Sequence, residues 1–226
     1  MVRLVLFDVD GTLIRTDGAG VKAFARTMTS TFQCPSGADK IKFAGRTDVS
    51  LVRELFALNQ IEPTAGNFRR FFDCYPFWLD HLLERGGGGV CAGVRELLDD
   101  LRALPQPPLL GLLTGNIRLG AELKLRRFGL WDCFETGAFA DDHEDRNQIA
   151  VVAKGRGSDQ LKQDLRGDQI VVVGDTAHDV QCGRCIGARV LAVSTGGSTL
   201  EQLRLHQPDW LVEDLRAVTA EEVAGS

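Results

Sequence analysis

The sequence predicts an α/β protein, built on a doubly wound parallel sheet of the Rossmann-like kind with a small all-helical domain attached. Four short runs are apolar at every position: Leu4–Phe7, Leu109–Leu113, Ile170–Val173 and Val190–Val193. Because helices cover both faces of a parallel sheet, its strands are apolar throughout rather than alternating. Helical stretches separate the four runs, and this alternation is typical of a doubly wound sheet.

Weaker patterns predict further elements of the same sheet. Residues 94–104 carry apolar side chains at the spacing of one helical face, so this helix should lay one side on the sheet. Its apolar residues are Val94, Leu97, Leu98, Leu101 and Leu104. Two shorter runs, Phe134–Phe139 and Trp210–Val212, predict additional strands.

One long segment breaks the alternation of strands and helices. Residues 16–88 show helical patterns and no convincing buried strand, and glycine-rich stretches, Asp17–Gly20 and Gly86–Gly89, lie at their two ends. Glycine supplies the backbone freedom that a hinge or a sharp domain entry requires. We therefore expect residues 16–88 to form a helical cap, and residues 1–15 and 89–226 to form the core. The alternative is that these glycines mark ordinary loops.

Composition and charge restrict the class of protein. Hydrophobic residues make up 44% and charged residues 25% of the 226 residues, which excludes a disordered chain. The net charge of −5 argues against nucleic acid as a partner. No apolar run approaches the ~18 residues of a transmembrane helix, so no membrane association is expected. Met1 leads almost directly into the first strand, without a secretory leader, and this predicts a cytoplasmic protein.

Two acidic motifs follow two of the predicted strands. Asp8 and Asp10 lie in Asp-Val-Asp-Gly-Thr-Leu directly after the first strand, and Asp175 and Asp179 lie in Gly-Asp-Thr-Ala-His-Asp after the strand at residues 170–173. Open α/β sheets bind ligands at the carboxyl ends of their strands. Carboxylates gathered there repel one another unless a hard cation such as Mg²⁺ lies between them. The two strands are therefore expected to be neighbours that share one metal ion, although either motif alone also fits an ordinary turn.

These motifs resemble those of the haloacid dehalogenase superfamily, in particular its phosphoglycolate-phosphatase-like branch, in which a helical cap follows the first strand. The acidic start, Thr114 at the end of the strand at residues 109–113, and the second acidic motif occur in the expected order. The resemblance covers nearly the whole chain. It implies that Asp8 is the nucleophile, forming an aspartyl-phosphate, and that Asp10 is the general acid and then the base.

The resemblance also assigns the metal site and the contacts to the phosphoryl group. It implies that Asp175 completes a Mg²⁺ site with Asp8 and the backbone carbonyl of Asp10, and that Asp179, one helical turn further on, anchors the ligands. Thr114 would donate to a phosphoryl oxygen. The residues that follow it, Gly115 and Asn116, would contact the substrate. Locally, the Thr-Gly-Asn sequence is equally able to cap a helix that begins near Ile117.

The family also uses a basic residue, usually a Lys before a Pro, to neutralise the nucleophile and the phosphate. This chain has no Lys-Pro sequence. Arg146 lies nearest the expected place, and Lys154, about two helical turns later, is the competing candidate. Arg146 is able to bind phosphate with two N–H groups and stays charged. The alternative for Arg146 is a solvated side chain among acidic neighbours.

The predicted cap carries one polar motif that could face the site. Phe-Ala-Gly-Arg-Thr-Asp at residues 43–48 resembles a loop that faces the active site in these enzymes, so Arg46 and Thr47 are candidates for reading the non-phosphate end of the substrate. The alternative is a helix that begins here, with Thr47 as its N-cap and Arg46 exposed.

Together these features predict a Mg²⁺-dependent phosphomonoester hydrolase that acts on a small phosphorylated metabolite. Two alternatives stay open: a phosphomutase of the same superfamily, and a non-catalytic binding module that kept the fold. A dehalogenase is disfavoured because Asp10 has no role in displacing a halide. The sequence does not indicate the substrate or the oligomeric state.

Overall fold

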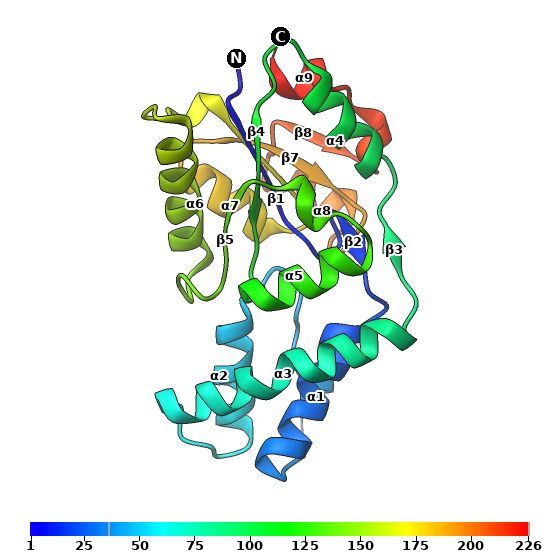
Figure 1. Ribbon diagram of the computed structural model, residues 1–226, viewed down its shortest axis with the longest axis vertical. Helices are drawn as coiled ribbons and strands as arrows, with labels where there is room; N and C mark the ends of the chain where they lie inside the picture. The colour runs from blue at the N-terminus through cyan, green and yellow to red at the C-terminus, as the bar shows by residue number, and fades with distance from the viewer. Residues whose placement is uncertain (36, 226) are drawn as a thin grey trace.

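A single parallel sheet forms the centre of the molecule (Figure 1). The computed structural model describes residues 1–35 and 37–225, and within these ranges six strands hydrogen-bond in the order β5-β4-β1-β6-β7-β8, all parallel. The strands are β1 (Leu4–Phe7), β4 (Leu109–Leu113), β5 (Thr136–Ala138), β6 (Ile170–Gly174), β7 (Arg189–Val193) and β8 (Trp210–Val212). The predicted fold class is confirmed, and both weaker apolar runs contain strands.

Helices cover both faces of the sheet because successive residues of each strand point to opposite sides. Val5 and Phe7 of β1 contribute to one apolar cluster, and Leu4 and Leu6 contribute to another on the opposite face. The first cluster is covered by α4 (Val94–Ala103), α5 (Arg118–Arg127) and α9 (Ala220–Ala224), and the second by α6 (Arg146–Leu161) and α7 (Ala177–Cys185). The short helix α8 (Leu200–Arg204) lies against β8.

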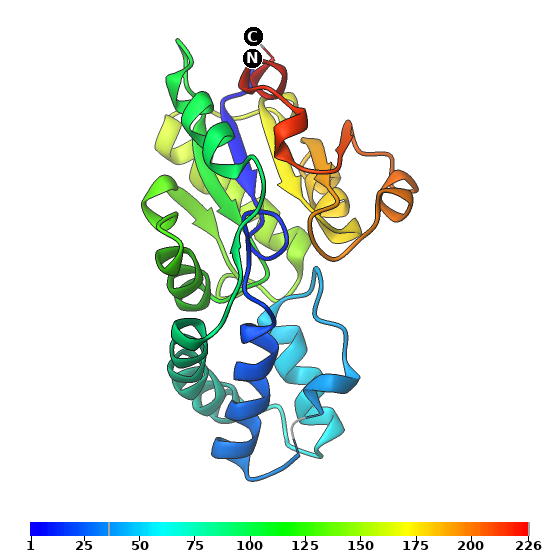
Figure 2. The same cartoon turned by 90° about the vertical axis from the view of Figure 1, so that its right-hand side faces the viewer.

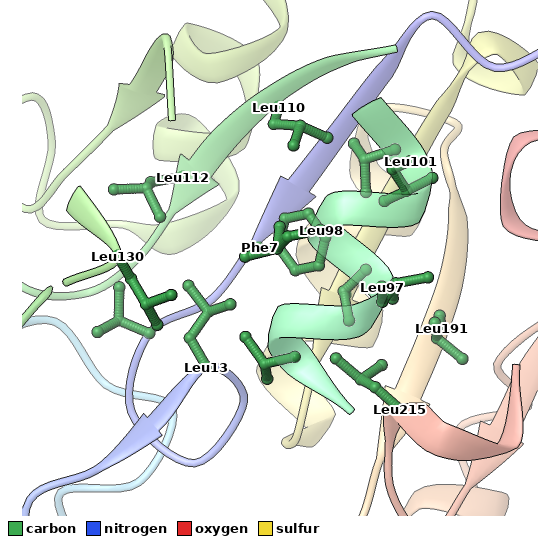
Figure 3. Packing of buried hydrophobic residues seen from close by; sticks show 14 of the residues in the cluster. Phe7, Leu13, Leu97, Leu98, Leu101, Leu110, Leu112, Leu130, Leu191 and Leu215 are labelled. Atoms are coloured by element: carbon green, nitrogen blue, oxygen red, sulfur yellow. The ribbon is translucent and has the colours of Figure 1, made fainter. Parts of the chain in front are cut away.

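Helix α4 shows how the sequence pattern becomes packing (Figure 3). Its predicted apolar face lies on the sheet, and Leu97, Leu98 and Leu101 are among the residues that surround Phe7. The helix ends at Ala103, one residue before the end of the predicted pattern. Leu104 precedes Pro105, and the residue before a proline is pushed out of the helical conformation.

The cap consists of three long helices below the core (Figure 2). They are α1 (Ala19–Phe32), α2 (Asp48–Leu58) and α3 (Ala65–Arg85), with the 3-10 turn η1 (Ala38–Lys40) between the first two. Their apolar faces meet in a separate cluster that includes Phe24, Phe56, Phe71 and Tyr75. Most neighbouring rings of this cluster lie edge to face or tilted, for example Phe24 against Tyr75 at 4.8 Å between centroids, whereas Phe71 stacks on Tyr75.

The chain enters and leaves the cap through two adjacent strands. The strand that enters the cap, β2 (Ile14–Arg15), pairs antiparallel with the strand that leaves it, β3 (Gly89–Val90). Gly88 has φ +107°, and a Cβ atom there would lie 2.1 Å from the carbonyl oxygen of Arg15, so only glycine fits this crossing. The domain boundaries after residues 15 and 88 stay predictions. Among the described residues, no helix is long and apolar enough to span a membrane.

Candidate active site

The carboxyl ends of β1, β4 and β6 bring the predicted motifs together. Phe7, the last residue of β1, is in register with Leu112 of β4 and with Val173 of β6. The residues that follow these positions therefore leave the sheet at one edge. The expectation that the two acidic motifs follow neighbouring strands is confirmed by the pairing of β1 with β6.

Three carboxylates form a buried cluster at this edge. Asp8, Asp175 and Asp179 each offer an oxygen within 4.8 Å of the others, and none is more than 5% exposed. Burial raises the pKa of Asp8 and of Asp175, and the neighbouring carboxylates raise both further. Buried carboxylates at such distances require compensating positive charge, and oxygen ligands of this kind suit a hard divalent cation. The residues present therefore fit a Mg²⁺ ion.

Asp179 accepts more hydrogen bonds than the other two carboxylates. The backbone N–H and the hydroxyl of Thr176 donate to its Oδ2 at 2.9 and 2.7 Å, and Arg146 donates to its Oδ1. Asp175 accepts from the hydroxyl of Thr12 at 3.1 Å and from the N–H of Gly197. Asp179 thus lies beside the candidate metal ligands and pairs with Arg146, and its anchoring role stays a prediction.

Arg146 supplies the positive charge within this cluster. It is the first residue of α6, and the carboxylate of the preceding residue, Asp145, caps the helix. Its guanidinium forms ion pairs with Asp8, at 2.9 Å, and with Asp179. Burial opposes the charge, but these two carboxylates hold the pKa of Arg146 well above its usual value. Its Nε is buried without a hydrogen-bond partner among the described residues. Lys154 lies two turns further along α6 and does not line the cavity at the cluster.

Asp10 belongs to a second polar group, with Asn116, Thr114 and Lys124, and Lys124 is a residue that the sequence analysis did not single out. The amide of Asn116 donates to Asp10 Oδ2 at 2.8 Å and to the hydroxyl oxygen of Thr114 at the same distance. Lys124 donates to Asp10 Oδ2 and to Asn116 Oδ1, both at 2.6 Å. Lys124 is only 4% exposed.

The sequence analysis did not single out Lys124, which occurs in Lys-Leu-Arg-Arg, a sequence that is typical of a solvated helix end. A signal was nevertheless present. The buried positions of α5 are Gly120, Ala121, Lys124 and Leu125. Lys124 therefore falls three residues after the apolar Ala121 and directly before Leu125, on the face that packs inward. A lysine at such a position needs a buried partner, and here it is Asp10.

A cavity of about 200 Å³ joins these groups between core and cap. The core side presents Asp8, Asp10, Thr114, Lys124 and Arg146. The cap side is mainly apolar, with Val21, Phe24, Phe43, Leu51 and Tyr75. The core end of the cavity is therefore charged, whereas the cap end is mainly apolar with Arg46 and Asp48 beside it, and this suits a ligand with a compact anionic head.

Arg46 and Thr47, the two residues of the cap loop that were expected to contact the substrate, bond to other groups of the protein. Thr47 is the N-cap of α2: its Oγ1 accepts from the N–H of Ser50 at 3.3 Å and donates to the carbonyl of Glu144 at 2.8 Å. Thr47 does not line the cavity. Arg46 lines it, but its guanidinium pairs with Glu54 and donates to the carbonyl of Ser50. The capping alternative for Thr47 thus describes its observed contacts.

Gly115 and Asp48 join this loop to the core. The backbone N–H of Asp48 donates to the carbonyl of Gly115 at 2.7 Å. A Cβ atom on Gly115 would lie 2.2 Å from the carbonyl oxygen of Arg46, so the cap approaches this position more closely than any side chain allows. Helix α5 has Ile117 as its N-cap with no side-chain cap of its own, so Thr114 and Asn116 do not cap it.

Comparisons with known proteins agree with this architecture. Residues 5–193 match the family model described as "Haloacid dehalogenase-like hydrolase". The chain is 27% identical over 237 residues to "Probable phosphatase IndB" of Dickeya dadantii, covering 100% of this chain and 94% of that protein. It is 31% identical over 133 residues to a phosphoglycolate phosphatase of Synechococcus elongatus, covering 56% and 58% of the two chains.

A solved structure shows the same fold. The crystal structure described as a "predicted phosphoglycolate phosphatase" of Haemophilus somnus 129pt superposes with a TM-score of 0.75 at 18% identity, covering 98% of this chain and 96% of that one. The family match spans most of the chain, including both acidic motifs, Thr114 and Arg146. The chain belongs to the haloacid dehalogenase-like hydrolase family.

Proposed function

We propose that this protein is a Mg²⁺-dependent phosphomonoester hydrolase that acts on a small phosphorylated metabolite through an aspartyl-phosphate on Asp8. One observation carries the proposal. The Asp8 carboxylate lies at the end of β1, paired with Arg146, and lines a cavity that also contains Asp10 and Thr114. A nucleophile, a second carboxyl group and two phosphate-binding side chains therefore share one small space.

Arg146 and Thr114 would bind the phosphoryl group. The guanidinium beside Asp8 offsets the repulsion between the attacking carboxylate and the anionic phosphate, and its unpartnered Nε provides a further donor. The hydroxyl of Thr114, which accepts from Asn116, is free to donate its own proton to a phosphoryl oxygen. Donors held in place before the reaction stabilise the charge that develops on those oxygens.

The two carboxyl groups would divide the chemistry. Asp8 attacks phosphorus, forming the Asp8–phosphate bond as the bond to the ester oxygen breaks. Asp10 gives its proton to the departing oxygen, and then accepts a proton from the water that hydrolyses the aspartyl-phosphate. The Asp10 side chain is 41% exposed at the cavity, so it is accessible both to a leaving group and to water.

Asp8, Asp175 and the backbone carbonyl of Asp10 would hold Mg²⁺. When bound, the ion supplies positive charge that orients the phosphate and offsets the carboxylates. Asp179 keeps Arg146 beside Asp8 through the ion pair described above.

The size of the cavity and the charges beside it favour a small substrate. A volume of about 200 Å³ accommodates a phosphate with a leaving group of a few carbon atoms. Arg46 at its edge would contact a second polar group of the substrate once its pairing with Glu54 is exchanged. The similarity to a phosphoglycolate phosphatase supports a substrate of this size.

A phosphatase assay on the purified protein tests the proposal. We expect release of inorganic phosphate from p-nitrophenyl phosphate with Mg²⁺, and loss of that activity in EDTA. Asp8→Asn removes the attacking charge with little change of shape, so turnover should fall by about a thousandfold or more. Asp99→Asn, whose side chain is 78% exposed on α4, is the matched control and should keep full activity. An Asp8→Asn variant with normal turnover would refute the covalent mechanism, and an inactive wild type would favour a binding module.

A further inference from the structure

The environment of Lys124 is unusual for a lysine. Its side chain is 5% exposed and lines the cavity, where a Cβ atom on Gly20 of the cap helix α1 would be 3.6 Å from Nζ. Burying an ammonium group is unfavourable unless it is paired and hydrogen-bonded. Here it pairs with Asp10 at 2.6 Å. Neither the acidic motifs nor the expected basic position of the family accounts for this residue.

The contacts of Lys124 distinguish the two oxygens of Asp10. The ammonium group and the amide of Asn116 both donate to Oδ2, at 2.6 and 2.8 Å. Lys124 also donates to Asn116 Oδ1, so the three side chains form a closed triangle. Within residues 1–35 and 37–225, no side chain or backbone group donates to Oδ1 of Asp10. One oxygen is therefore held by two donors, and the other is left for the proton.

We propose that Lys124 is a positioning residue for proton transfer at Asp10, an inference that rests on the proposed function. By holding Oδ2, Lys124 and Asn116 make Oδ1 the atom that exchanges the proton with the ester oxygen. In that step the bond from phosphorus to the ester oxygen breaks, and its electron pair stays on the oxygen. The oxygen takes the proton from Oδ1, and the negative charge passes to the Asp10 carboxylate. The ammonium group stabilises that charge as it forms.

This role predicts a dependence on the leaving group. A strongly basic leaving group needs the proton in the transition state, whereas a weakly basic one departs as an anion and needs it little. Phenyl phosphate and p-nitrophenyl phosphate differ little in shape, and phenolate is the more basic of the two leaving groups. If Lys124 had only a structural role, replacing it would lower kcat for the two esters equally.

The test compares Lys124→Met with Arg126→Met, an exposed position on the same helix whose side chain is 52% exposed. Lys124→Met should lower kcat for phenyl phosphate by about thirtyfold or more, and kcat for p-nitrophenyl phosphate by about threefold or less. The dissociation constant of inorganic phosphate should change by less than about twofold, because other residues contact the phosphate. Arg126→Met should match the wild type on both esters.

A double-mutant cycle tests whether Lys124 acts through Asp10. In an Asp10→Asn background, adding Lys124→Met should have no further effect, since the group that it positions is gone. Met is of similar size, and the partly exposed Asp10 regains water, so we expect Lys124→Met to fold, with a thermal unfolding scan as the check. If it does not fold, Lys124→Gln retains one donor and should show a smaller loss with the same preference between the esters.

The outcomes separate this inference from the proposed function. Equal losses on both esters, or additive losses in the Asp10→Asn background, would overturn the role of Lys124 while leaving the hydrolase intact. A wild-type protein that hydrolyses neither ester would overturn the proposed function, and this inference with it.

Discussion

The carboxylate of Asp48, in the cap, accepts a hydrogen bond of 2.8 Å from the backbone N–H of Ile117, at the start of the core helix α5. Helix N-termini leave N–H groups that need an acceptor, and α5 has no side-chain cap of its own. The cap domain therefore provides an acceptor for the N–H of Ile117 from 69 residues away, while Asp141 of the core accepts from the N–H of Arg118. The same helix carries Lys124, so the contact joins the cap to the element that reaches Asp10.

The pH dependence of stability should reveal the buried Asp48. Burial raises its pKa from 3.8 to about 7, with Lys124 acting in the opposite direction and Asp10 and Asp141 adding to the rise. An acid with a raised pKa binds more protons when folded, so its contribution to stability is lost as the pH rises towards 7. Asp48→Asn stays neutral and keeps an acceptor oxygen for Ile117.

Relative to the wild type, Asp48→Asn should therefore gain up to about 4 kcal/mol in free energy of unfolding between pH 4 and pH 8. Urea denaturation at several pH values measures this difference. The exposed Asp99→Asn variant should show no such trend. A difference for Asp48→Asn that stays constant with pH would contradict the assigned environment of the carboxylate.

Replacing Gly115 should disturb the docking of the cap. A Cβ atom there would lie 2.2 Å from the carbonyl oxygen of Arg46 and 3.0 Å from the Cα of Thr47, so the backbone of the cap loop must move. Gly115→Ala should lower the free energy of unfolding by about 1–3 kcal/mol and lower kcat/KM by about tenfold. Gly155→Ala on α6, where a Cβ meets no atom within 4 Å, is the control and should not destabilise. Equal behaviour of the two variants would contradict this contact.

The roles of Arg146 and Lys154 can be separated by substitution. Arg146→Ala leaves Asp8 and Asp179 buried without their partner, so kcat should fall by at least about tenfold and stability by about 3–5 kcal/mol. Lys154→Ala should change kcat by less than about twofold. Arg146→Lys, which keeps the charge but not the two-pronged geometry, should recover part of the loss. A larger effect on kcat at Lys154 than at Arg146 would show that the basic residue was misassigned.

Substrate selection should depend on Arg46. If it exchanges Glu54 for a second anion on the substrate, Arg46→Ala should lower kcat/KM for phosphoglycolate by about 10- to 150-fold, which corresponds to about 1.5–3 kcal/mol. Hydrolysis of p-nitrophenyl phosphate should change little. Arg53→Ala, which breaks an ion pair between the cap and Glu144, is the control for cap closure and should affect both esters alike. If Arg46→Ala lowered kcat/KM equally for phosphoglycolate and p-nitrophenyl phosphate, Arg46 would serve closure of the cap rather than substrate selection.

The sequence alone determined the sheet and the position of the acidic motifs on it. A strand buried on both faces leaves a continuous apolar run, and a motif that follows such a run lies at the ligand-binding edge of the sheet. Asp8, Asp175 and Thr114 could therefore be placed from local pattern, and Arg146 from its position relative to the family motif. The helical cap likewise followed from the absence of such runs between residues 16 and 88.

The tertiary structure alone decided which polar side chains meet between core and cap. Asp48 and Lys124 are ordinary residues of their helices in the sequence, and each acquires its role from a partner 69 or 114 positions away. Thr47 is the opposite case: the sequence singled it out as a candidate substrate contact, but its hydroxyl accepts a local capping bond and donates to a distant carbonyl. Local patterns record propensity and burial, whereas a contact between residues far apart in the sequence depends on how the packed elements are oriented, which no short stretch of sequence encodes.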